Sequence, residues 1–233
     1  MQREARCGAC SALLLLLAAC GSPARPAEHV DPAVELMEEL FPAPRQGLAL
    51  AADASLGRLV DDFAASTEWT VLADRDTRAR IDATAAGLDR AQGVSARDVH
   101  RFVETLLVQH GYALSIASAR TPRILRLVAM DGPNARGARA NLLQVEPSRL
   151  GAWAREHPAF QLQAIVRAEH LDARAFANSM RPMVSDVNAQ LVIPVGDGHE
   201  LVLVGFAPWL AHVCDTLAAL DRAQPPEAAP VQR

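Results

Sequence analysis

The 233-residue sequence has no lysine, few aromatic residues and no excess of positive charge. All 23 basic side chains are arginine, 27 side chains are acidic, and the formal net charge is -4; aromatic residues make up 4%. Proteins that bind nucleic acid normally carry a basic excess or a basic face, so the charge balance argues against that class of partner. Half of the residues are hydrophobic and 21% are charged, a composition typical of a globular protein.

Motifs of catalysis and cofactor binding are missing as well. The chain contains no G-x-S-x-G, no Walker loop and no G-x-G-x-x-G. The histidines form no H-E-x-x-H pair, and no Cys/His cluster has zinc-ligand spacing. They are His29, His100, His110, His157, His170, His199 and His212. We expect His110 and His199 to be solvated or to cap local structure. The sequence predicts no catalytic residue, metal site or cofactor, and hence no enzyme.

No hydrophobic run is long enough for a permanent membrane helix. The run at residues 12–19 has eight apolar residues, which as a helix reach only about 12 Å, against about 30 Å of hydrocarbon. It fits the core of a secretory signal. Leu17-Ala18-Ala19-Cys20 resembles the bacterial lipobox, which implies cleavage before Cys20 and lipid attachment to its sulfur. The alternative is an ordinary signal peptide with an accidental cysteine.

The residues after the predicted cleavage site bear on location and on disulfides. Gly21 and Ser22 follow Cys20, where lipoproteins kept at the inner membrane often carry Asp; the resemblance therefore favours the outer membrane, on its periplasmic side. Cys7 and Cys10 fall in the discarded peptide. Cys214 is then left without a thiol partner, and we expect it to be buried and inert.

Breaker residues divide the mature chain into parts. We expect a proline-rich tether, a first module, a linker with a short strand and helix, a second module and a disordered tail. Their bounds are 20–46, 47–130, 131–158, 159–222 and 223–233. One short helix around residues 32–40 is expected within the tether. The predicted fold class is α+β, with two small two-layer modules.

The first module is predicted as β-α-β-β-α-β-β. Leu56, Leu59, Val60 and Phe63 have the spacing of one buried helix face. Ser95, with Asp98 three residues later, is a capping signature for a second helix that ends at Gly111. The strands are expected at residues 48–51, 69–72, 80–84, 112–117 and 124–129, the third of them exposed. Arg75, Arg78 and Arg80 are expected on a solvated edge, with contact to an acidic partner as the less favoured alternative.

The second module is predicted as β-α-β-β-α. Its strands are expected at residues 160–166, 191–195 and 201–205, and the last two flank an Asp197-Gly198 turn, a strong hairpin signal. Asp172 is expected to cap the first helix, and Pro208 to start the last one. Pro194 cannot donate to a ladder, so its strand is expected either to lie at an edge or to turn this position outward. Helices on these connections would leave one face of the sheet uncovered.

Several short motifs of the second module resemble the repeated N-terminal domain of bacterial secretins, the outer-membrane pores of type II and type III secretion and type IV pili. They are A-I-V-R-A-E-H-L-D-A at 164–173, S-M-R-P-M-V-S at 179–185, L-V-L-V-G at 201–205 and L-A-A-L-D at 217–221. The first module is similar to the domain that opens secretins and some TonB-dependent receptors, in its helix at 56–63, its strand at 70–72 and Gly93-Val94-Ser95. Nothing resembles the pore region.

The resemblance implies a role in protein docking, because these secretin domains pack into rings and contact inner-membrane components. The leading hypothesis is a non-catalytic outer-membrane lipoprotein that docks to a secretin or to other secretion or pilus proteins, as a single chain or as a homo-oligomer. The first alternative is a periplasmic sensor or ligand-binding lipoprotein with a TonB-receptor-like signalling domain. An exported hydrolase with a dispersed site near His100 or His170 is the second. The β-α-β-β-α order also resembles K-homology RNA-binding domains, but their G-x-x-G loop and basic groove are missing.

Overall fold

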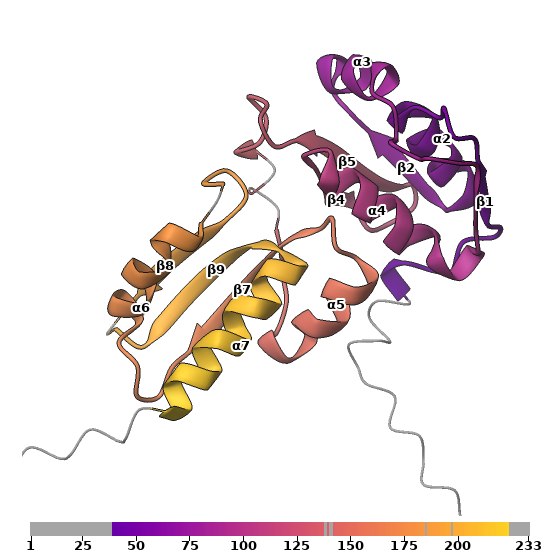
Figure 1. Ribbon diagram of the computed structural model, residues 1–233. Coiled ribbons are helices and arrows are strands. Elements are labelled where there is room, and N and C mark those ends of the chain that lie inside the picture. Colours follow the sequence, from indigo (N-terminus) through magenta and orange to yellow (C-terminus); the bar gives the residue numbers. More distant parts are fainter. Residues whose placement is uncertain (1–38, 138, 140–141, 185, 197, 224–233) are drawn as a thin grey trace, which may run out of the picture. The chain divides into compact units, whose positions relative to one another are not determined.

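The structure is a computed structural model that describes residues 39–223, except residues 138, 140–141, 185 and 197. The expected signal peptide, Cys20, most of the tether, Asp197 and nearly all of the tail lie outside the described residues. In the described part, none of the helices combines the length and the hydrophobicity that a membrane crossing requires. This part is an α+β protein with helices packed on small mixed sheets (Figure 1).

The first module contains a two-stranded and a three-stranded sheet. Its elements are β1 (Leu48–Leu50), α2 (Leu56–Ser66), β2 (Trp69–Leu72), α3 (Arg75–Ala83), β3 (Gln92–Val94), α4 (Val99–Gln109), β4 (Tyr112–Ser118) and β5 (Arg123–Ala129). Strands β1 and β3 pair antiparallel. The larger sheet has the order β2-β5-β4, with β2 parallel and β4 antiparallel to β5. The hairpin expected from the apolar runs at 112–117 and 124–129 is therefore present.

Helix α2 follows the predicted periodicity. The Ser55 side chain accepts the N–H of Arg58 and so caps the first turn. Leu56, Leu59 and Phe63 are at most 1% exposed, which places the predicted face in the core.

The prediction of a strand at residues 80–84 is wrong, because residues 80–83 belong to helix α3 and Thr84 is its C-cap residue. Asp74 caps the helix by accepting the N–H of Thr77 at 2.8 Å. Arg78 binds Asp82 one turn later, and Ile81 is fully buried. The alternation around Ile81 imitates a strand, but the cap and the i,i+4 pair stabilise a helix with a single narrow buried face.

Two further details of the first module differ from expectation. Strand β3 is not among the expected strands, because a segment of three residues carries no periodic signal. Ser95 lies at the predicted helix start, but its hydroxyl donates to the Asp98 carboxylate at 2.7 Å and caps no backbone N–H. A 3-10 turn at Ala96–Asp98 then leads into α4.

The second module is one four-stranded sheet with three helices in the described residues. Its elements are β6 (Leu143–Gln144), α5 (Leu150–Glu156), β7 (Gln161–Arg167), α6 (Ala173–Met180), β8 (Leu191–Val195), β9 (Glu200–Phe206) and α7 (Ala207–Ala223). The sheet order is β6-β7-β9-β8. The predicted linker does contain a strand and a helix. However, β6 pairs parallel with β7 and α5 packs on α7, so this segment is built into the second module.

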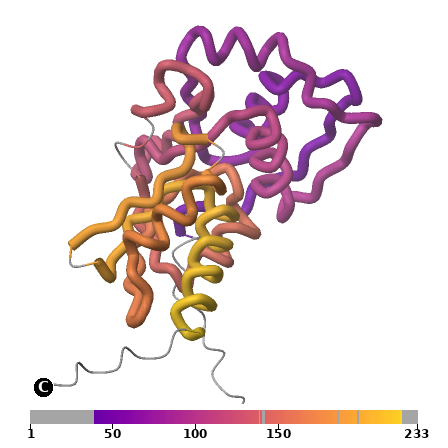
Figure 2. Tube along the Cα trace, turned by 60° about the vertical axis from the view of Figure 1, so that its left-hand side comes forward, coloured from indigo at the N-terminus to yellow at the C-terminus, as the bar shows by residue number. Residues whose placement is uncertain are grey.

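The turns and caps predicted for the second module are present. The Asp172 side chain accepts the N–H of Ala175 at 2.8 Å. Strands β8 and β9 form a hairpin closed by the Val195–Glu200 pair, and Gly196 and Gly198 in its turn have positive φ. Pro208 lies in the first turn of α7, which runs along the strands in two views (Figures 1 and 2).

Most buried hydrophobic side chains of the two modules belong to one continuous core, and a small second cluster contains Ala113, Met130, Ala135 and Ala189. Phe160, next to β7, forms a bridge with Leu114 of β4, and the Leu114 N–H donates to the Ala159 carbonyl at 2.9 Å. The Phe41 ring contacts two other rings, Trp69 in a tilted arrangement at a centroid distance of 5.4 Å and Phe160 edge to face at 5.0 Å. These contacts join the two sheets through aromatic side chains.

Candidate functional site

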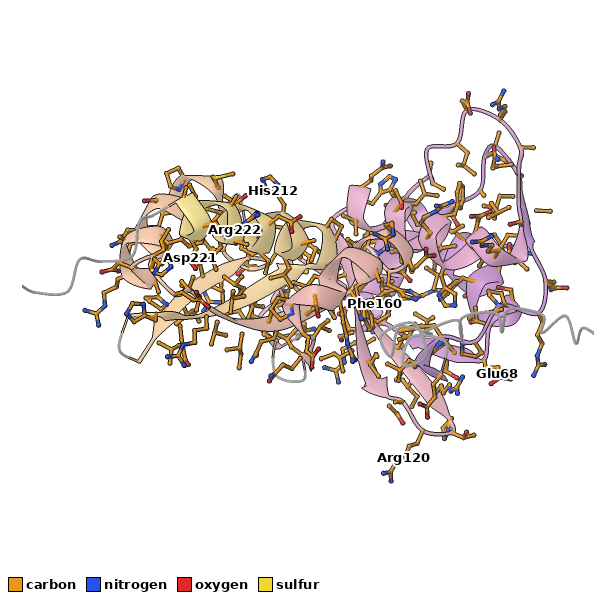
Figure 3. The ribbon with its side chains drawn as sticks, turned by 90° about the horizontal axis from the view of Figure 1, so that it is seen from below. Glu68, Arg120, Phe160, His212, Asp221 and Arg222 are labelled. Atoms are coloured by element: carbon orange, nitrogen blue, oxygen red, sulfur yellow. The ribbon has the colours of Figure 1, made fainter. Side chains whose placement is uncertain are left out.

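The four-stranded sheet has helices on one face. Helix α7 packs against β7 and β9, and α6 packs against β8 and β9. Figure 3 shows α7 on one side of these strands. The side chains on that side are fully buried: Leu162, Ala164, Leu201 and Leu203. Successive side chains in a strand point to opposite faces, so the alternate residues lie on the other face.

That second face is open over part of its area and carries an apolar row, although Gln163, Arg167 and Glu200 lie on the same face. Val202 of β9 pairs with Ile165 of β7 on one side and Ile193 of β8 on the other, so the three side chains form a row across the sheet. Ile165 and Ile193 are 43% and 44% exposed, and Val195 in the next row is 42% exposed. We call Ile165, Val202, Ile193 and Val195 the outer sheet face.

The far end of the same sheet face is covered. Phe206, which ends β9, packs with Met130, Ala135 and Ala189. Among the described residues, this cover does not extend to the outer sheet face, whose isoleucines stay exposed.

Strand β8 is an edge of the sheet, as Pro194 predicted. A groove of about 620 Å³ lies between this strand and α6, and its lining includes Ala177, Val187, Val192 and Pro194. Val187 is 68% exposed beside it. The groove is also lined by Arg174, Arg181 and other polar residues. An open edge next to such a groove is a setting in which another chain can add a strand.

The arginines around α3 bind carboxylates of their own chain. Arg78 holds Asp61 at 2.7 Å and also binds Asp82, which lowers the pKa of Asp61 below its ordinary value, chiefly through the hydrogen bond. Arg80 binds Asp131 at 2.9 Å. These two arginines therefore form intramolecular ion pairs at a solvated edge, as the favoured interpretation of the sequence required.

His100, Glu104 and His157 form a buried cluster, whose two histidine rings contact Phe41. His100 and Glu104 stand one turn apart on α4, and His157 follows α5. His157 Nδ1 is 2.9 Å and His100 Nδ1 is 3.6 Å from Glu104 Oε1. The Ala159 N–H donates to Glu104 Oε2 at 3.2 Å. Among the described residues, this is the single group of three or more His, Cys, Asp or Glu side chains spaced to hold one metal ion.

Burial changes the acid–base properties of this cluster. The Glu104 side chain is fully buried, and this raises the pKa of its carboxyl to about 7, although His100 acts in the opposite direction. Burial lowers the pKa of His157 to about 3, so its imidazole is neutral at physiological pH. The arrangement offers a neutral nitrogen ligand beside a carboxyl group that ionises near neutrality.

Sequence reasoning did not find this cluster. Only one part of the cluster has a signal in the local sequence. His100 and Glu104 lie one turn apart, among the buried Val99, Val103 and Leu107 of α4. His157 is 53 residues beyond Glu104, and no spacing rule connects it to the helix. Searches for paired histidines or cysteines do not detect a carboxylate with one local and one distant imidazole.

The other residues singled out by the sequence are not brought together with this cluster. Cys214 of α7 is buried, and burial raises the pKa of its thiol to about 11, consistent with an inert cysteine. His110 is the C-cap residue of α4. His212 lies on α7 at an exposed position (Figure 3). Cys20 and His29 lie outside the described residues.

Comparisons with known proteins identify the fold. No protein-family model and no curated protein matches the sequence. A chain of the Klebsiella pneumoniae type II secretion system outer membrane complex, which contains PulD, PulS and the PulC HR domain, matches with a TM-score of 0.54 and 12% identity over 74% of this chain. The present chain covers 26% of that chain's length.

Two further matches have low TM-scores. The N-terminal domain of the secretin XcpQ from Pseudomonas aeruginosa has a TM-score of 0.25 at 12% identity, covering 78% of this chain and 67% of that one. A chain of the GspC–GspD complex of enterotoxigenic Escherichia coli has 0.25 at 13%, covering 76% and 99%. From the sheet topology and the Klebsiella match, the described chain has a secretin N-terminal-like fold.

Proposed function

We propose that this protein is a non-catalytic docking lipoprotein of a secretin-type secretion or type IV pilus system. Lipid on Cys20 would hold it in the outer membrane, with both modules in the periplasm. The fold supports this proposal, because the matched Klebsiella chain belongs to an outer membrane complex of several proteins. The lipobox-like Leu17-Ala18-Ala19-Cys20 supports the anchor.

The observation that carries the proposal is the outer sheet face beside the open β8 edge. Ile165 and Ile193 lie on either side of Val202, Val195 is two residues beyond Ile193 on the same face, and these three side chains are each more than 40% exposed. Contiguous exposed apolar side chains mark interaction surfaces more often than isolated ones do. A partner that covers this face removes apolar area from water, and a partner strand can bond to the free edge of β8.

The size of the face indicates the kind of docking. Full burial of an aliphatic side chain gives about 1.5–3 kcal/mol, and these three side chains are already more than half buried. Together they contribute only about 3 kcal/mol, below the cost of about 4 kcal/mol or more for association. Stable docking therefore requires additional contacts, such as strand pairing at β8 or repeated contacts in a ring.

Pro194 limits how a partner strand can pair. It is the next-to-last residue of β8 and supplies no N–H to a ladder. A partner strand must therefore place no required acceptor opposite this position. The same residue reduces uncontrolled edge-to-edge pairing.

Co-purification from outer membranes after cross-linking in cells tests the proposal. The wild-type chain should recover a secretin or another component of the machinery, or further copies of itself together with one. Ile193→Asp should reduce this recovery at least about tenfold, a loss of about 1.4 kcal/mol in docking free energy. Leu220→Asp is the matched control, because Leu220 is 47% exposed on α7, away from the outer sheet face. Recovery of no secretion or pilus component with the wild-type chain would refute the proposed function, as would equal losses with both variants.

A further inference from the structure

The buried cluster contains a polar side chain that the hydrogen bonds of the protein leave unsatisfied. His100 is 7% exposed, and neither of its ring nitrogens has a hydrogen-bond partner among the described residues. Burying such a group without a partner costs about 1–3 kcal/mol. An orphaned buried imidazole beside a carboxylate and a second imidazole is a common sign that another group belongs at the site.

The separations within the cluster suit a small cation. In a tetrahedral zinc site with bonds of about 2.0–2.1 Å, neighbouring ligand atoms lie about 3.3 Å apart. Glu104 Oε1 is 2.9 Å from His157 Nδ1 and 3.6 Å from His100 Nδ1. The first distance is slightly shorter and the second slightly longer than that separation. One ligand atom from each of the three residues lies within 4.8 Å of the other two. An adjustment of at most about 1.5 Å then reaches metal-site distances.

The surroundings of the cluster also have features of a metal site. The Ala159 N–H holds the second carboxylate oxygen of Glu104, which fixes the direction of the first one. Aromatic rings enclose the histidines, with Phe41 4.0 Å from His157 and Phe63 5.1 Å from His100, between ring centroids. Such an apolar shell strengthens the attraction between a cation and its ligands.

An access route leads to the cluster from the surface. A pocket of about 590 Å³ is lined by both His100 and His157, together with Phe41 and Pro44. The charged residues of the same pocket are Arg97, Arg155 and Glu156, and all three are exposed, so solvent screens their charges. The pocket provides a path for an ion and space for a water molecule as a fourth ligand.

The geometry points to a divalent transition-metal site, best suited to Zn²⁺, formed by His100, Glu104 and His157. Two imidazoles and one carboxylate are ligands that Zn²⁺ accepts, and a water completes four-coordination. The ion links α4 of the first module to the residue that follows α5 of the second. Binding of the ion therefore ties these two segments together. This inference does not depend on the proposed docking partner.

Zinc titration of the untagged full chain, purified in detergent and stripped with a chelator, tests this site. Isothermal titration calorimetry should find one Zn²⁺ per chain, and Co²⁺ in its place should give the visible absorption of a tetrahedral centre. His100→Gln and His157→Gln should each weaken Zn²⁺ binding by at least about 100-fold, beyond the roughly 10- to 100-fold expected when a group that only orients a ligand is lost. His212→Gln, which changes a histidine on α7 outside the cluster, should bind as the wild type does.

Glu104→Gln covers the case in which a histidine variant does not fold. Its amide oxygen can still accept the Ala159 N–H, so the chain should fold, but the charge that holds the ion is gone and Zn²⁺ affinity should fall at least about tenfold. Three outcomes would overturn the site: no saturable Zn²⁺ binding, a Co²⁺ spectrum without tetrahedral bands, or the same affinity in Glu104→Gln as in the wild type. A loss of binding with His212→Gln alone would place the metal on the surface and likewise refute it.

Discussion

The carboxylate of Asp221, near the end of α7, accepts the backbone N–H of His170 at 2.8 Å. It also accepts the N–H groups of Glu169 and Leu171 at 2.9 and 2.8 Å. One side chain (labelled in Figure 3) thus binds three consecutive amides in the loop between β7 and α6. These two segments are both parts of the secretin-like sequence pattern. The Leu-Asp sequence near the end of α7 therefore has a structural reason. The Asp221 side chain ties α7 to the loop that leads into α6.

Replacing this carboxylate should destabilise the second module. Asp221→Asn keeps one oxygen but places an NH₂ donor where another N–H points. We expect a loss of about 1–2 kcal/mol in the free energy of unfolding, the lower part of the range for bonds to a charged group, because Asp221 is partly exposed. Urea denaturation measures this. Asp215→Asn, at an exposed position on the same helix, should change stability little; an equal effect of both variants would contradict the role of Asp221.

The same contact predicts a dependence of stability on pH. The N–H of Glu169 above all, followed by those of His170 and Leu171, lowers the pKa of Asp221 below its ordinary 3.8. Because the pKa is lower in the folded state than in the unfolded state, the contribution is complete above about pH 4 and is lost as the pH falls through the folded value. The stability difference between wild type and Asp221→Asn should be constant at neutral pH and shrink in acid. A difference that stays unchanged well below about pH 4 would contradict this assignment.

The parts of the fold that can be predicted from the sequence are those with strong local signals. The face of α2, the Asp172 cap and the β8–β9 hairpin each depend on a few neighbouring residues. Helix α3 could not be predicted in this way, because it is held by packing against α2 and by the burial of Ile81 in the core, and both depend on the tertiary structure. Strand β6 looks like part of a linker because two residues acquire strand character only by pairing with β7.

The features of the candidate site also differ in whether they can be predicted from the local sequence. Pro194 indicated the sheet edge because proline lacks an N–H, a property of one residue. The outer sheet face requires the register that places Ile165 and Ile193 on either side of Val202, which the order of strands along the chain does not contain. The buried cluster requires α4 and the end of α5 to meet in space, and only the packing of the two modules provides that.

Gly205 gives a second structural reason for a motif residue. It ends the L-V-L-V-G motif in β9, and a Cβ there would lie 2.5 Å from Cε3 of the Trp209 ring. Gly205→Ala should therefore force the indole away and destabilise the protein by about 1–3 kcal/mol, the usual range for overpacking. Thermal or urea unfolding measures this change.

A second substitution separates this clash from a backbone effect. In a Trp209→Leu background the ring is gone, so Gly205→Ala should cost much less than it does in the wild type. Double-mutant cycles resolve such coupling between residues in contact. An alanine penalty that is the same in both backgrounds would show that Trp209 is not the reason for the glycine.

The proposed lipid anchor predicts a simple change of location. Cys20→Ser removes the sulfur that would carry the diacylglycerol. Several acyl chains, at about 0.8 kcal/mol per buried CH₂, anchor a protein stably, and their loss should release it. Metabolic labelling with an alkyne fatty acid should mark the wild-type protein in the outer-membrane fraction. The serine variant should be unlabelled and should leave that fraction.

Cys214→Ser is the control and should keep both label and location, because Cys214 is buried in α7. A wild-type chain without label, or label that persists in Cys20→Ser, would show that the chain is not a lipoprotein anchored through this cysteine.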